Sequence, residues 1–236
     1  MRQWSYYTPI LAYHRVGELK GDHVPTVSAQ TFERHLAFLA RYRYQVIKLE
    51  TLAATLEHGQ PMPRHTAIIT FDDGYEETHR VAWPLLKRFG LAATIFVTPA
   101  EVGLPGFVTW QQLQELASDG MTIGSHTLHH SYLPLVEEAQ LSQELGESKQ
   151  LIETHVGQSV ELLSYPVGGF TPFVQGVAQQ IGYRAACTTN RYAPSAPIDR
   201  YGLRRIKVTE RDANPLMFLA KVSGYYDLFR QLREPS

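Results

Sequence analysis

The sequence is poor in cysteine, in net charge and in long apolar runs, and each shortage excludes a class of protein or site. Cys187 is the only cysteine among 236 residues, so an internal disulfide and a cysteine-rich zinc site are both excluded. Any metal site in this chain must therefore be built from histidine and carboxylate side chains.

No window approaches the ~18 apolar residues that a membrane-spanning helix requires, and the first thirty residues lack the apolar core of a signal peptide. We therefore expect no integral membrane segment and a cytoplasmic protein, although a chain trimmed of an export signal would look the same. A net charge of −1 provides no overall attraction to nucleic acid, so none is expected as a partner. The oligomeric state is left open.

Short apolar runs alternate with helical patterns along the whole chain, including a long polar helix from about Glu137 to His155. Such alternation predicts βα units and a mainly parallel sheet. Eight units in this length favour an α/β barrel over an open sheet, and we expect one domain over residues 1–236 with its chemistry at the carboxyl ends of the strands. The eight predicted strands are 9–13, 44–49, 67–69, 93–97, 121–124, 161–165, 183–187 and 203–208.

Two adjacent carboxylates, Asp72 and Asp73, follow the apolar run 67–69 just before Gly74. Consecutive residues of a strand point to opposite faces, but where the strand is ending both side chains can face one cavity. One would then be a metal ligand and the other a general base. The alternative is a polar turn that caps the following helix.

Three histidines lie within the segment 125–130. His126 and His130 are spaced i, i+4, which on a helical turn brings both rings to one face. Two imidazoles and one carboxylate form a recognised ligand set for divalent metals, so Asp73, His126 and His130 are candidate ligands. Such an ion lowers the pKa of its water to about 7 and polarises a carbonyl oxygen. The alternative is a polar loop with incidental histidines.

These motifs resemble those of a known family. Phe71-Asp72-Asp73-Gly74, together with His126-Thr127-x-x-His130, is similar to the first two motifs of the polysaccharide deacetylase family, also called the NodB-homology family or carbohydrate esterase family four. Residues 10–16 resemble the opening of many members, and Ser164-Tyr165-Pro166-x-Gly168 resembles the third motif. The resemblance covers roughly residues 9–208 and implies a distorted (β/α)7 barrel.

The resemblance also implies an activity and the residues that carry it. It implies a metal-dependent hydrolase that removes N-acetyl groups from an amino sugar in a polysaccharide, glycan precursor or glycolipid. Asp72 would be the general base, and the peptide N–H of Val167 would bind the oxyanion together with the metal. The implied metal ligands are Asp73, His126 and His130. This set suits Zn²⁺, and also Co²⁺, Ni²⁺ or Fe²⁺.

The third motif departs from the family pattern. Ser164 stands where the family commonly has an arginine, so another cation should hold Asp72 in place. Arg204 and Arg205 are the candidates, and we prefer Arg205 because it lies nearer the interior of its predicted strand. The alternative is that both arginines are solvated surface charges.

The family's last motif, Leu-x-His, which supplies the general acid, is not found after Ile206. His14, at the end of the first predicted strand, is the candidate substitute. The alternative for His14 is a buried imidazole that is hydrogen-bonded beneath the barrel mouth.

Two other functions remain open from the sequence. A carbohydrate-binding pseudoenzyme would keep the metal site without turnover, and the departures at Ser164 and in the last motif favour it. The intact Asp72 argues against it. An O-acetyl esterase or a small-molecule amidohydrolase of the same fold would use the same residues on another substrate.

Overall fold

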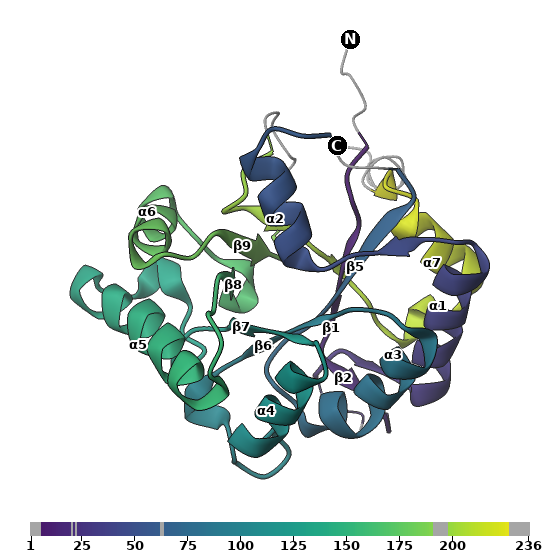
Figure 1. Ribbon diagram of the computed structural model, residues 1–236, viewed down its shortest axis with the longest axis horizontal. Helices are drawn as coiled ribbons and strands as arrows, with labels where there is room; N and C mark the ends of the chain where they lie inside the picture. Colours follow the sequence, from purple (N-terminus) through teal and green to yellow (C-terminus); the bar gives the residue numbers. More distant parts are fainter. Residues whose placement is uncertain (1–5, 20, 22, 62–63, 191–197, 227–236) are drawn as a thin grey trace.

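Parallel strands form a sheet that nearly closes into a barrel, with helices around it (Figure 1). The computed structural model describes residues 6–19, 21, 23–61, 64–190 and 198–226. The strand order is β10-β9-β8-β7-β6-β5-β1-β11, and each neighbouring pair is parallel. The bounds are β1 Ile10–Tyr13, β5 Thr66–Phe71, β6 Thr94–Val97, β7 Thr122–Ser125, β8 Leu162–Ser164, β9 Ala185–Thr188, β10 Leu203–Arg204 and β11 Ile206–Lys207.

One short stretch of chain joins the two ends of this sheet. β10 pairs with β9, where Leu203 lies opposite Cys187, whereas β11 pairs with β1, where Ile206 lies opposite Leu11. Arg205 lies between the two short strands. Since β10 and β11 together occupy one place in the barrel, the described part of the chain provides seven strand positions.

The predicted strand 44–49 is not a barrel position. Only β4 (Gln45–Val46) is extended there, and it pairs with the first two residues of β5. The prediction of a barrel is confirmed. Each of the eight predicted segments overlaps a strand, but only seven are barrel positions, because apolar periodicity marks an extended segment and not its partners. A small parallel pair that the sequence did not predict, β2 (Arg15–Val16) and β3 (Thr26–Val27), follows β1.

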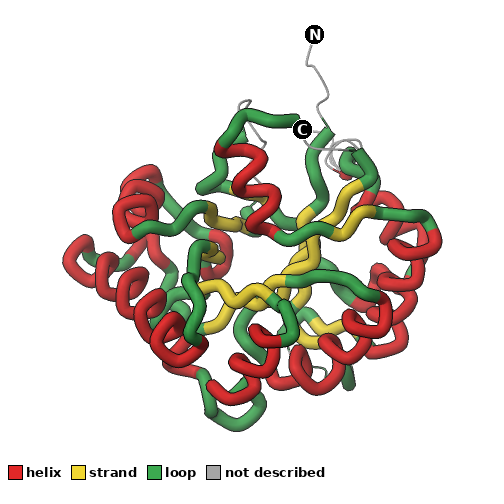
Figure 2. The backbone as a smooth tube through the Cα atoms, viewed as in Figure 1, coloured by secondary structure: helices red, strands yellow, loops and turns green. Residues whose placement is uncertain are grey.

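Helices cover the outside of the barrel, as the red segments around the yellow strands show in Figure 2. A capping box of Thr109 and Gln112 begins α4. Helix α7 was not predicted, although Asn214 and Pro215 carry the usual start signals. Within the described residues, none of the helices is both long and apolar enough to cross a membrane. The helices are α1 Ala29–Arg41, α2 Leu49–Glu57, α3 Trp83–Phe89, α4 Trp110–Ser118, α5 Glu138–Val156, α6 Pro172–Ile181 and α7 Pro215–Val222, with a π-helical turn at Thr78–Ala82.

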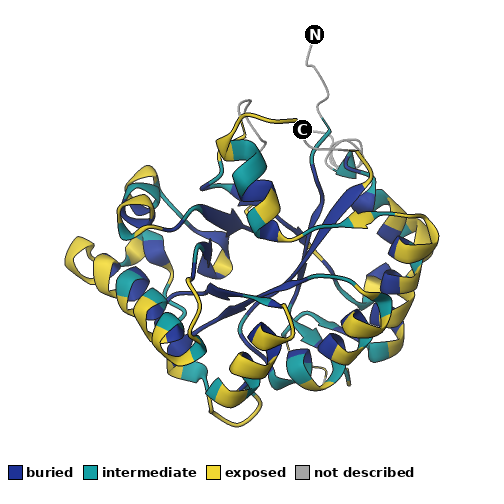
Figure 3. Cartoon of the chain, in the orientation of Figure 1, coloured by how far each residue is buried: buried dark blue, intermediate teal, exposed yellow. Residues whose placement is uncertain are grey.

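The barrel interior changes from apolar to polar along the strands. The barrel strands are mostly buried, whereas the helices expose their outer faces (Figure 3). Because side chains alternate along a strand, Ile68, Thr70 and Asp72 of the β5 segment share one face. Ile68 therefore belongs to the apolar half, and Asp72 lies at the carboxyl end. The apolar half is built from Ile10, Leu49, Leu52, Ile68, Phe96, Leu162, Ala185, Cys187 and Leu203.

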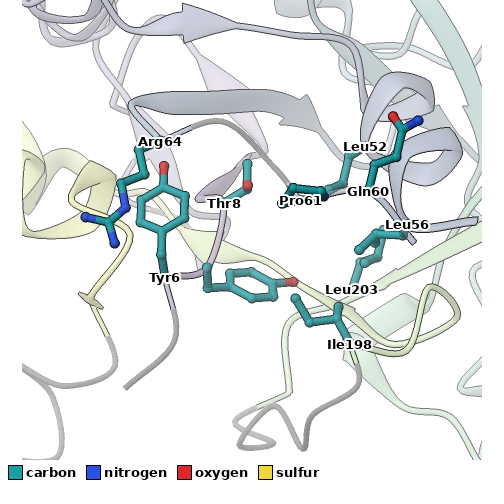
Figure 4. A pocket seen from close by; sticks show the side chains of 10 residues that line it. Tyr6, Thr8, Leu52, Leu56, Gln60, Pro61, Arg64, Ile198 and Leu203 are labelled. Carbon is teal, nitrogen blue, oxygen red and sulfur yellow. The ribbon is translucent and has the colours of Figure 1, made fainter. Parts of the chain in front are cut away.

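A cavity of about 280 Å³ lies at the opposite, amino-terminal end of the strands. Figure 4 shows Tyr6, Thr8, Leu52 and Leu203 around it. Thr8 precedes β1, and Leu52 belongs to α2, which covers this end of the barrel. The cavity is therefore separated from the carboxyl ends by the apolar half of the interior.

Gly124 of β7 is required by close packing against β6. A Cβ atom at position 124 would lie 2.6 Å from two ring carbons of Phe96. We expect Gly124→Ala to lower the free energy of unfolding by ~1–3 kcal/mol, because the buried ring must shift. Urea denaturation measures this change. The control is Gly176→Ala in α6, where a Cβ meets nothing within 4 Å, and it should raise stability by ~0.5–1 kcal/mol. Equal effects at both positions would contradict the packing argument.

Candidate metal centre

Asp73, His126 and His130 converge beyond the carboxyl ends of β5 and β7. One ligand atom from each lies within 4.8 Å of the others. Asp73 Oδ1 is 3.4 Å from Nε2 of His126 and 3.4 Å from Nε2 of His130. Ligands bound tetrahedrally at ~2.0–2.1 Å lie roughly 3.3 Å apart, so these separations and the nitrogen and oxygen donors fit one divalent ion.

The ring orientation of His126 leaves Nε2 free to bind a metal. His126 Nδ1 is 2.7 Å from the carbonyl oxygen of Ser164. A carbonyl only accepts hydrogen bonds, so Nδ1 carries the proton and Nε2 keeps its lone pair toward Asp73. Metal-binding histidines are typically held by such a contact from the other ring nitrogen.

Left-handed backbone turns bring these side chains together. Asp73 has φ 69°, Thr127 has φ 69° and His130 has φ 58°. The sequence predicted that a helical turn would align His126 and His130, and this geometry is wrong, because residues 126–130 form an irregular loop. The two rings nevertheless meet, with centroids 4.9 Å apart. Left-handed non-glycine residues cost ~1–3 kcal/mol each, so the surrounding structure must hold them.

Asp72 forms a buried ion pair with Arg205. The two Nη atoms donate to Oδ1 and Oδ2 of Asp72, each at 2.6 Å. Asp72 is 2% exposed and Arg205 4% exposed. Burial by itself would raise the pKa of Asp72, but the pKa lies below its usual value, and the charge of Arg205, with its hydrogen bonds, is the largest influence that lowers it. Asp72 is therefore a carboxylate at neutral pH.

Arg205 makes three further contacts, with residues of β5, β8 and β6. Its Nη1 donates to Thr70 Oγ1 at 3.1 Å, and its Nη2 donates to Ser164 Oγ at 2.7 Å. The guanidinium lies 5.3 Å from the centroid of the Phe96 ring. Arg204 is directed elsewhere, 5.9 Å from the ring of Tyr7. Of the two candidate arginines, the structure brings Arg205 to Asp72, and Ser164 accepts a hydrogen bond from it.

His14 follows β1 and lies close enough to Asp72 and Asp73 for their charges to act on it. Burial lowers the pKa of His14, and the two carboxylates counteract only part of that effect. Its Nδ1 is buried without a hydrogen-bond partner among the described residues. The alternative raised from the sequence, a buried imidazole that is hydrogen-bonded beneath the mouth, therefore gains no support from Nδ1.

Val167 lies in the short 3-10 turn Pro166–Gly168 after β8. Its φ is 57°, which is unusual for a β-branched residue. Its side chain is 71% exposed. The residue that ends β8, Ser164, bonds to His126 through its carbonyl oxygen, so the turn begins beside the candidate metal site. Only the backbone of Val167 can serve the site.

An aromatic pair and an arginine stand beside Asp73. Tyr75 stacks on Phe107 with ring centroids 5.2 Å apart, and the guanidinium of Arg15 lies 4.3 Å from the Tyr75 ring. Burial and the nearby charge of Asp73 raise the pKa of Tyr75. Sequence reasoning missed Phe107, Arg15 and the contacts of Thr70. Of these, only Thr70 could have been found from the sequence, because it lies two residues before Asp72 and so faces the same side of the strand.

The chain is similar to known proteins in sequence and in fold. A family described as polysaccharide deacetylase matches residues 59–186. A putative polysaccharide deacetylase of Bacillus subtilis, YxkH, is 32% identical over 201 residues, which cover 85% of this chain and 71% of that protein. A Staphylococcus aureus poly-β-1,6-N-acetyl-D-glucosamine N-deacetylase is 23% identical over 199 residues, covering 78% and 68%. The structure of Streptococcus pyogenes deacetylase PplD in complex with acetate superimposes with a TM-score of 0.84 at 24% identity, covering 91% and 97%, and shares the fold.

Breaking the buried ion pair should cost much more than breaking an exposed one. We expect Arg205→Met to lower the free energy of unfolding by ~3–5 kcal/mol, because Asp72 is left buried without its counter-charge. The double variant Asp72→Asn/Arg205→Met should recover part of this loss. Urea denaturation of the wild type, the single variant and the double variant measures these changes. Arg184→Met, which breaks two partly exposed pairs, is the control and should cost at most ~1 kcal/mol per pair. A loss at Arg205 no larger than this would contradict a buried pair.

Proposed function

Because the chain belongs to the polysaccharide deacetylase family, we propose that it is a metal-dependent hydrolase that removes N-acetyl groups from an amino sugar. The amino sugar would belong to a polysaccharide, a glycan precursor or a glycolipid. The single observation that supports this most is the ionised, buried Asp72 directly beside the ligand set of Asp73, His126 and His130. A purely metal-binding or structural protein has no need of a base in that position.

Asp73, His126 and His130 would hold the ion, and Zn²⁺ is our first choice. Co²⁺, Ni²⁺ and Fe²⁺ take the same ligand set. When bound, the ion would polarise the acetyl carbonyl and acidify the attacking water. All other steps fall to the side chains and backbone around the site.

Asp72 would accept the proton of the attacking water. Each of its oxygens already accepts one hydrogen bond from Arg205, and each retains a further lone pair. Arg205 keeps Asp72 ionised and fixes its plane. The peptide N–H of Val167 would donate to the acetyl oxygen as negative charge develops there, which is the role of an oxyanion hole.

His14 would donate a proton to the leaving amine. Burial lowers its pKa, so a smaller fraction of the rings carries a proton at neutral pH. Each protonated ring is a correspondingly stronger acid. The amine needs this proton because an amide anion is too basic to leave.

N-acetylglucosamine polymers are the first substrates to test, because the Staphylococcus aureus relative is named for one. We expect the metal-loaded protein to release acetate from β-1,6-linked N-acetylglucosamine oligomers, in a panel with acetylated xylan. Asp72→Asn should reduce release by ~10²–10⁴-fold through loss of the base, while metal binding persists. A chelator should abolish release, and added Zn²⁺ should restore it.

Asp119→Asn, at an exposed pair with Lys87, is the control and should leave release unchanged. Circular dichroism checks that Asp72→Asn folds. Release that continues undiminished in folded Asp72→Asn would refute the proposed base. No release from any member of the panel, with metal bound, would favour a carbohydrate-binding protein instead.

His14→Ala should affect amides more than activated esters. We expect ~10²–10⁴-fold slower hydrolysis of the N-acetyl sugar. Hydrolysis of 4-nitrophenyl acetate should change little, because its leaving group needs no proton. The control His79→Ala removes an imidazole that pairs with Glu115. An equal loss on both substrates would assign His14 another role.

A further inference from the structure

A carboxylate on α5 binds the loop that carries the candidate histidine ligands. Glu144 is 9% exposed and accepts four hydrogen bonds from this loop. Oε2 accepts the peptide N–H groups of Leu128 and His129, both at 3.1 Å. The Leu128 N–H is shared with the main-chain carbonyl oxygen of Glu144, at 3.0 Å, whereas the His129 N–H is bonded to the carboxylate. Oε1 accepts Nδ1 of His129 at 2.8 Å and the hydroxyl of Ser131 at 3.0 Å. We call residues 126–131 the histidine loop.

The histidine loop needs such support because its backbone is strained and irregular. Thr127 and His130 are both left-handed, which costs ~1–3 kcal/mol each. Peptide N–H groups in an irregular buried loop have no ladder partners and must find other acceptors. Glu144 provides an acceptor for two of these groups. A charged acceptor forms stronger hydrogen bonds than a neutral one.

A second residue of α5 supports the start of the same loop. Ser148 lies four residues after Glu144, on the same face of the helix, and its hydroxyl is 2.7 Å from the hydroxyl of Ser125. Ser125 Oγ in turn accepts the N–H of Thr127 at 3.2 Å. Helix α5 packs beside β7, and Figure 1 shows the two elements as neighbours. The loop is thus held from outside the barrel by one helical face.

We infer that Glu144 is a positioning residue of the metal centre, which holds the histidine loop in the conformation where His126 and His130 both face Asp73. It touches neither the ligand atoms nor a substrate, so it acts through the loop. The inference rests on the proposed metal role of the two histidines. Burial by itself would raise the pKa of Glu144. Hydrogen bonds from His129 and Ser131 lower it by more than burial raises it, so the carboxylate stays charged.

The decisive variant is Glu144→Gln, which keeps the size of the side chain and removes its charge. An amide offers one acceptor oxygen and turns an NH₂ group toward donors. We expect the dissociation constant for Zn²⁺ to rise ~10–100-fold, the usual effect of losing a residue that orients a metal ligand. The visible spectrum of bound Co²⁺ should change as well, because the ligand geometry changes.

Glu153→Gln is the matched control. Glu153 lies on the same helix and accepts hydrogen bonds from Lys149 and from the N–H of Val160, outside the histidine loop. Its loss should leave both metal affinity and the Co²⁺ spectrum unchanged. In a His130→Ala background, Glu144→Gln should have a smaller effect on affinity, because one of the two ligands through which it acts is already gone. A general loss of stability would not produce this dependence.

Unchanged Zn²⁺ affinity and an unchanged Co²⁺ spectrum in folded Glu144→Gln would overturn the inference. If Glu144→Gln does not fold, the double variant His129→Ala/Ser131→Ala decides, since it removes both side-chain donors and leaves the charge. Weaker binding in that variant supports the inference, and unchanged binding overturns it. A wild-type protein that binds no ion would refute the proposed function itself, which is a distinguishable result.

Discussion

The buried pair of Asp72 and Arg205 is the interaction on which the rest of the site depends. Arg205 lies where the chain passes from β10 to β11, the point at which the barrel closes. From there its guanidinium donates hydrogen bonds to Thr70 of β5 and to Asp72, which follows the end of β5. It also donates to Ser164 of β8. Two charges buried in this way are tolerated only when the pair has good geometry and further hydrogen bonds. Both Nη atoms of Arg205 make such bonds, and only its Nε has no partner among the described residues. The residue at the closure of the barrel is therefore also the residue that keeps the candidate base ionised.

The change from an apolar to a polar interior explains how the base and the ligands lie side by side. The two-residue period turns Ile68, Thr70 and Asp72 inward in succession. Asp73 lies just past the end of the strand, and its left-handed backbone directs its side chain toward His126 and His130 instead. Adjacent carboxylates therefore acquire different surroundings. Asp72 faces a guanidinium, and Asp73 faces two imidazoles.

The two sides of the metal centre are supported from opposite directions. The carboxylate side is held from within the barrel by Arg205, and the histidine side is held from outside by Glu144 of α5. Both supports are charged groups that accept or donate several hydrogen bonds in surroundings with little water, where such bonds are strong when every partner is present. The left-handed residues in the loop of Asp73 and in the histidine loop can persist because hydrogen bonds from the surrounding structure offset the backbone strain.

Local patterns in the sequence were enough to predict a parallel barrel, its strands within a few residues, and the residues that meet at its carboxyl end. The alternation of strands and helices is a property of neighbouring residues, and so is the turn chemistry at Gly74. The i, i+4 spacing pointed to His126 and His130, although the loop that carries them is not helical. The tertiary structure alone decided three things. The first is that segment 203–208 pairs partly with β9 and partly with β1. The second is that Arg205, and not Arg204, faces Asp72. The third is that Glu144 reaches the histidine loop. Each depends on register or packing between segments far apart in the chain, which no local pattern encodes.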